Sequence, residues 1–128
     1  MAKNFVQDGV NLTLVESTLV HVDSSGVADG LANGGDAVVQ GTITGVALVD
    51  ASATTDLIAV ATEGVFSLPV QGVNGSGNVA VASGDKVYID PSTGVLSKIA
   101  TGVLFGKALG AVASGNTTTT IDVRLIQA

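Results

Sequence analysis

Few residues of this chain carry side chains that could do chemistry, and they occur singly. His21 is the only histidine, and it lies in the alternating stretch TLVHVD, where a solvated or hydrogen-bonded imidazole is a simpler interpretation than a catalytic base. Multi-histidine and thiolate metal sites are excluded, because the chain also lacks cysteine. Ser83 and Lys86 have the Ser-x-x-Lys spacing of acyl-transferring hydrolases, but that motif needs a helix and companion motifs, and here it opens a strand.

Two acidic residues share a local sequence: Asp36 in GDAVVQG and Asp85 in GDKVYID. Paired carboxylates could act as general acid and base. The alternative is structural, since Gly supplies a permissive backbone and Asp accepts hydrogen bonds from turn amides just before a strand. The sequence favours this second interpretation. The stretch DSSGVADG (23–30) lacks the spacing and the final Glu of a calcium loop, and is better explained as a turn. We therefore expect no catalytic residue, no metal ligand and no cofactor.

The elements that carry these residues are predicted to be short strands. Alternation of apolar and polar residues with period two dominates, and Gly, Asn, Asp and Ser clusters separate the alternating stretches. The strand candidates are residues 10–16, 18–23, 37–41, 43–49, 57–62, 64–68, 79–82, 86–90, 103–112 and 119–126. The fold class is thus all-β, a small β-barrel or β-sandwich, with at most one short helix or turn near residues 50–57, capped by Asp50 or Ser52.

Two longer-range features follow from the strand pattern. KVYID runs through PSTG into VLSKIA, which predicts a hairpin in which Pro91 presets the turn and Gly94 adopts a positive φ. Residues 35–62 and 84–126 also resemble each other, because each begins with Gly-Asp before a strand and continues into a strand containing Gly-x-Ala-Leu. Either the fold has two pseudo-repeated halves, or strands rich in Gly, Ala, Val and Thr resemble one another by composition alone.

Composition and length predict a single β domain at residues 10–128, preceded by an N-terminal arm at residues 1–9. A monomer of this mass would expose about 6,000 Å². Its five basic and eleven acidic residues leave roughly one charge per 400 Å², so part of the surface is expected to be covered by other subunits or a partner. The sequence shows neither a signal peptide nor a membrane span, and the absence of cysteine suits a reducing cytoplasm.

Charge is distributed unevenly along the chain. Residues 1–64 hold eight acidic residues and only Lys3, a net charge of −7, whereas residues 65–128 hold four basic and three acidic residues, a net charge of +1. The linear sequence shows no basic patch and few aromatic residues for base stacking, which argues against nucleic-acid binding.

Several stretches resemble a family of tailed-bacteriophage capsid decoration, or cement, proteins. They are MAKNFVQDG at the start, GVALVDA, EGVFSLPV, SGDKVYID and GKALGAVASGNTTTTIDVRLI, which follow in the family's order over nearly the whole chain. The resemblance implies a non-enzymatic virion protein that binds the outer face of an assembled head. Its partners would be the major capsid protein and copies of itself, commonly in trimers, with assembly in the host cytoplasm.

The N-terminal arm is the candidate partner-binding segment. Its terminal position and the aromatic Phe5 suggest strand addition to a coat protein or a neighbouring subunit, through Lys3, Asn4, Phe5, Val6 and Gln7. Alternatively, Phe5 packs under its own barrel. Two other functions stay open: a fibre, spike or glycan-binding surface module, which the scarcity of aromatic residues disfavours, and a small hydrolase, which lacks a catalytic constellation.

Overall fold

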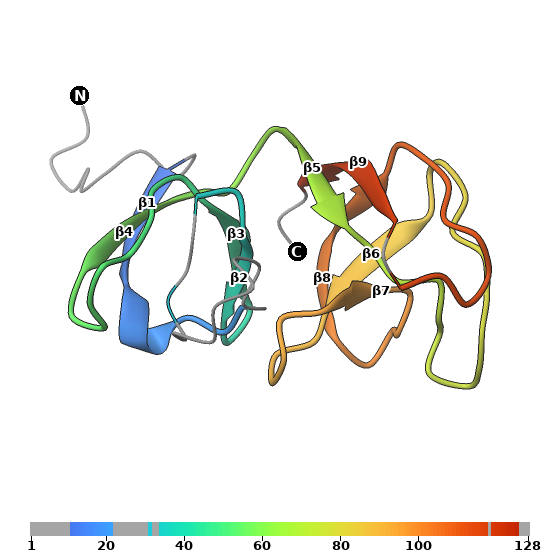
Figure 1. Cartoon of the computed structure of the whole chain (residues 1–128), viewed down its shortest axis with the longest axis horizontal. Coiled ribbons are helices and arrows are strands. Elements are labelled where there is room, and N and C mark those ends of the chain that lie inside the picture. The colour runs from blue at the N-terminus through green and yellow to red at the C-terminus, as the bar shows by residue number, and fades with distance from the viewer. Residues whose placement is uncertain (1–10, 22–30, 32–33, 118, 126–128) are drawn as a thin grey trace, which may run out of the picture.

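The computed structural model describes residues 11–21, 31, 34–117 and 119–125, which form two curled antiparallel sheets (Figure 1). The first, here called sheet A, has the strand order β1-β4-β3-β2, and its strands are β1 (Asn11–Val15), β2 (Ala37–Gln40), β3 (Ile43–Ala47) and β4 (Leu57–Ala61). The 3-10 helix η1 (Glu16–Thr18) follows β1. Sheet A is thus built entirely from the first half of the chain.

The second half of the chain forms sheet B, with the strand order β5-β9-β8-β6-β7. Its strands are β5 (Val65–Pro69), β6 (Lys86–Ile89), β7 (Leu96–Ser97), β8 (Val103–Ala108) and β9 (Thr120–Leu125). All strand pairs in both sheets are antiparallel. The described residues contain no α-helix, so the all-β prediction is confirmed.

The two sheets repeat one topology, which confirms the pseudo-repeat. The order β1-β4-β3-β2 corresponds to β5-β9-β8-β6, and β7 is an addition to sheet B. The hydrogen bonds also correspond: Gly35 N–H donates to the Ala47 carbonyl at 2.7 Å, and Gly84 N–H donates to the Ala108 carbonyl at 2.7 Å. Gly35 and Gly84 have φ values of 97° and 95°, a region that residues with a Cβ rarely adopt. The shared Gly-Asp motif therefore marks the same turn in both halves.

The hydrophobic core lies in two clusters. The smaller one is enclosed by sheet A and contains Leu19, Val38, Ala47, Ile58 and Val60. The larger one is built around Phe105 and the inward-facing residues of sheet B, and it also contains Val39 and Val46 from β2 and β3. The outer face of sheet A thus packs against the open side of sheet B, with β3 lying against β8 (Figure 1).

Some predicted elements differ from the structure at their boundaries. Residues 79–82 form only an isolated bridge between Val81 and Val112, and Val20 forms another with Val39. In the region 50–57, residues 50–56 form turns without a helix, and β4 begins at Leu57. The predicted strand at 103–112 ends at Ala108. In the two predicted strands that are shorter than expected, 79–82 and 103–112, the alternating pattern is present, but no neighbouring strand lies in register to continue the ladder.

The predicted hairpin is confirmed. β6 pairs with β7 through Tyr88↔Ser97 and Ile89↔Leu96. Gly94 has a φ of 79° and donates its N–H to the Asp90 carbonyl at 2.8 Å. The turn residues after Pro91 therefore set the pairing register of β7.

The strand-centre glycines Gly45 and Gly106 occupy equivalent positions, and at each a Cβ would collide with a carbonyl oxygen of the neighbouring strand, that of Ala61 or Arg124. We predict that Gly106→Ala lowers the free energy of unfolding by about 1–3 kcal/mol, because backbone on both sides must move. Gly34→Ala is the control, since its Cβ would meet its nearest atoms at an ordinary 3.5 Å. Urea unfolding of both variants checks this, and equal stability of the two would contradict the close approach.

Candidate partner-binding surfaces

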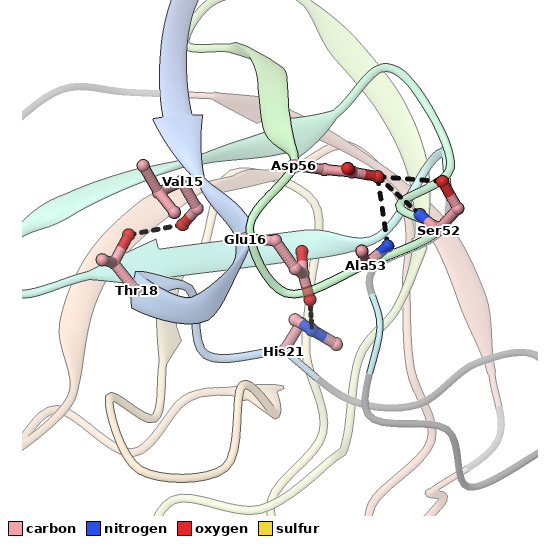
Figure 2. A network of polar contacts seen from close by, with 7 residues as sticks. All are labelled: Val15, Glu16, Thr18, His21, Ser52, Ala53 and Asp56. Atoms are coloured by element: carbon pink, nitrogen blue, oxygen red, sulfur yellow. Dashed lines mark hydrogen bonds and ion pairs between the residues drawn. The ribbon is translucent and has the colours of Figure 1, made fainter.

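The only histidine is held inside sheet A by a carboxylate (Figure 2). His21 Nε2 lies 3.0 Å from Glu16 Oε1, and their side chains are 5% and 2% exposed. The backbone at Glu16 is also fixed by a hydrogen bond, because the N–H of Glu16 donates to the Asp56 carbonyl at 2.9 Å. The hydrogen-bonded imidazole predicted from the sequence is confirmed. The pair connects the end of β1 to the segment that follows η1, away from the surface.

The two aspartates of the Gly-Asp motifs precede β2 and β6, which belong to different sheets. Asp85 Oδ2 accepts a hydrogen bond from Ala82 N–H at 2.8 Å and lies 3.0 Å from Lys98 Nζ. These contacts, the Ala82 amide first and then Lys98, lower the pKa of Asp85. The turn-capping role predicted for this residue is confirmed. Asp36 is buried at the equivalent position of sheet A.

Two further aspartates organise turns in the same way. Asp56 Oδ2 accepts hydrogen bonds from Ser52 N–H at 2.8 Å, Ser52 Oγ at 3.0 Å and Ala53 N–H at 3.1 Å (Figure 2). The Ser52 amide is the main cause of the lowered pKa of Asp56. Asp90 accepts from the hydroxyl and N–H of Ser92, and the hydroxyl is the main cause of its lowered pKa. Carboxylates that could have been reactive are thus engaged with backbone turns.

The described residues offer little room or chemistry for a small ligand. No group of three or more His, Cys, Asp or Glu residues among them could hold a metal ion. A hollow of about 160 Å³ lies between Asp36, Gln71 and Thr117, which is below the roughly 300 Å³ at which ligand pockets begin. The candidate calcium segment 23–30 falls outside the described part of the chain. No helix in that described part has the length and apolar character of a membrane span.

The outer face of sheet A carries an exposed apolar strip, defined by Val15, Leu48 and Leu57. Val15 and Leu57 are directly paired across β1 and β4, and Leu57 is 66% exposed. Leu48 donates its N–H to the carbonyl of Ala59, which lies two residues from Leu57 on β4. The strip continues outward from the part of this face that β2 and β3 bury against sheet B. Contiguous apolar side chains of this kind are typical of a surface that another chain covers.

The outer face of sheet B carries a different feature, a cation row formed by Lys86, Lys107 and Arg124. Lys86 pairs directly with Lys107 across β6 and β8, and Lys107 pairs directly with Arg124 across β8 and β9. All three side chains are exposed. This basic patch is not visible in the linear sequence, because Lys86 and Arg124 are 38 positions apart. Only the register of the paired strands brings the three cations together. Directly paired residues of an antiparallel sheet lie on one face, with Cβ atoms about 5 Å apart.

The arm residues predicted to bind a partner, Lys3, Asn4, Phe5, Val6 and Gln7, lie outside the described residues. The surfaces that the structure does describe were not singled out in the sequence. Alternation along β4, β8 and β9 indicates which residues face outward, but the pairing between distant strands is needed to assemble them into the apolar strip and the cation row.

Together, these features define a small all-β protein whose charged side chains stabilise turns and whose outer sheet faces are suited to contacts with other chains. Comparison with protein families agrees: a family model described as phage cement protein matches residues 11–125. The chain belongs to the phage cement protein family, which places it in the virion as a capsid-associated structural protein. No curated protein and no solved structure matched the chain.

The contacts of Asp85 predict a pH-dependent effect on stability. Because its pKa is lowered in the folded state, its stabilising contribution is present above the unfolded value near 3.8 and is lost as the pH falls through the folded value. Asp85→Asn should therefore lower the melting temperature at pH 7, and the difference from wild type should shrink at about pH 3. Ser83→Ala in the same turn is the control. A difference that is equal at both pH values would contradict the assignment.

Proposed function

We propose that this protein binds the outer surface of an assembled phage head and stabilises the head by bridging coat subunits. The observation that carries the proposal is the match of the cement-protein family model to residues 11–125. Such a protein needs no catalytic site. It stabilises the shell because it binds assembled coat protein better than free coat subunits, so its binding free energy favours the intact shell.

The proposed partners are the major capsid protein and further copies of the same chain, with a homotrimer expected. The apolar strip supports self-association, since Leu57 is 66% exposed beside Val15. Several subunits that each contact a different coat protein would add avidity beyond any single contact. We place the protein on the capsid exterior after assembly in the host cytoplasm, with neither nucleic acid nor membrane as a partner.

Binding to heads tests the proposed function. Purified protein should co-sediment with expanded heads that lack it. The occupied heads should break at a higher temperature, and at a higher denaturant concentration, than bare heads do. A glycan array serves as the comparison, because a glycan-binding surface module would bind there. Glycan binding without any binding to heads would contradict the proposal.

The N-terminal arm is proposed to contribute by strand addition to a coat protein or a neighbouring subunit. Deleting residues 2–7 should weaken head binding and leave the fold unchanged, because the family match and the first described strand both begin at residue 11. Head occupancy measured by sedimentation, with circular dichroism as the folding control, checks this. Unchanged occupancy would show that the arm does not contribute.

A further inference from the structure

The two halves of the fold use the same outer-face positions for different purposes. The positions of sheet A that correspond to the cation row are apolar: Ala37, Val46 and Ala61. Val46 is fully buried there, because this part of sheet A packs against sheet B. In sheet B the equivalent positions hold three exposed cations. Among the described residues, the equivalent three-stranded surface is therefore covered by the other sheet in the first half and left exposed in the second half.

The cation row carries an energetic cost in the isolated chain. Like charges at directly opposite positions of an antiparallel pair are destabilising, and here Lys107 has a cation on each side. The remaining described cation, Lys98, is instead paired with Asp85 at 3.0 Å. A row of unlike-charged or neutral residues would give the sheet more stability, so the row is best explained by an acidic partner that neutralises it.

Other residues of the same face favour a protein as that partner. Val65 pairs directly with Arg124 and is 53% exposed, and Leu109, two residues beyond Lys107, is 47% exposed. Asp122 lies between β5 and β8 on this face and accepts a hydrogen bond from Ser67 Oγ at 2.8 Å. Exposed apolar side chains beside cations are typical of protein interfaces, whereas affinity for nucleic acid comes mainly from contacts of cations with phosphates, which do not use apolar neighbours.

The chain's own acidic residues are poor candidates for this role. Four of the five described carboxylates in the first half are engaged or buried: Glu16 contacts His21, Asp36 is buried, Asp50 accepts from Gly34 N–H, and Asp56 accepts from its own loop. Only the fifth, Glu63, is exposed without such a contact. A second copy therefore offers few uncommitted carboxylates from these residues. The coat shell is the other partner available to a capsid-associated protein.

We propose that the outer face of sheet B, through Lys86, Lys107 and Arg124 flanked by Val65 and Leu109, docks on an acidic surface of the assembled coat protein. This inference rests on the proposed function and adds to it the face that meets the coat and the charge of the coat surface it meets. Since the chain has a net charge of −6, the row also orients the approach, because an acidic shell repels the other faces and attracts this one.

The test compares head binding of the wild type with that of the triple variant Lys86→Gln, Lys107→Gln and Arg124→Gln. We expect the variant to bind at least about 5-fold more weakly at low salt, since each surface ion pair contributes modestly. Between about 50 and 500 mM NaCl, wild-type binding should weaken, whereas binding of the variant should not weaken, because salt then screens only repulsion. The charge-conserving variant Lys86→Arg, Lys107→Arg and Arg124→Lys should bind as the wild type does.

A matched control separates the row from net charge. Thr42→Glu, Thr55→Glu and Ser114→Glu also make the chain more negative by three charges, at exposed turn positions outside this face. This control should bind at least about 3-fold more tightly than the Gln variant. Equal losses in both would overturn the proposal. If the triple variant fails to fold by circular dichroism, Lys107→Gln alone replaces it, with a measurable loss expected and no loss overturning the proposal.

Four further outcomes would overturn either this inference or the proposed function on which it rests. Wild-type protein that does not bind heads overturns the proposed function, whereas a wild type and Gln variant that bind equally overturn only this inference. If light scattering shows that the wild type is an oligomer and the Gln variant is a monomer, the row makes contacts between copies, and coat docking is overturned. Coat docking is also overturned if duplex DNA retains the wild type but not the Gln variant while both proteins bind heads equally.

Discussion

The packing of the outer face of sheet A against the open side of sheet B is the constraint on which the rest of the structure depends. A short curled sheet encloses only a small core, as the five-residue cluster inside sheet A illustrates. Sheet B encloses a larger core because Val39 and Val46 close it from the outside. The outer face of sheet A is therefore partly buried inside the folded chain. The two halves share one topology, but their outer faces differ in exposure.

This asymmetry connects the fold to the function of a capsid-associated protein. Sheet A must be apolar on both faces near β2 and β3, and the apolar strip at Val15 and Leu57 is the part of that face which sheet B does not reach. Among the residues that the structure describes, none buries the cations on the outer face of sheet B. The carboxylates of Asp56, Asp85 and Asp90 are occupied by turn amides and hydroxyls or by Lys98, and the proposed binding to the head therefore uses the exposed sheet surfaces.

Much of the fold could be predicted because its signals are local. Alternation located most of the strands, Pro91 and Gly94 located a hairpin, and the repeated Gly-Asp motif indicated equivalent turns with an aspartate cap at Asp85. The errors have one cause. Residues 79–82 alternate like a strand, but a strand also needs a neighbour in register, and there only Val81 finds one. The role assigned to the arm at residues 3–7 stays a prediction.

The sequence by itself determined the all-β class and favoured a structural role for the Gly-Asp turns, because backbone preferences and side-chain alternation act over a few residues. It indicated the two-fold repetition, which the strand order then confirmed. Only the tertiary structure decided which faces are buried and which charges lie together. Lys86, Lys107 and Arg124 are separated along the chain and become neighbours solely through pairing of β6, β8 and β9. Register arises from long-range packing, so no local pattern contains that information.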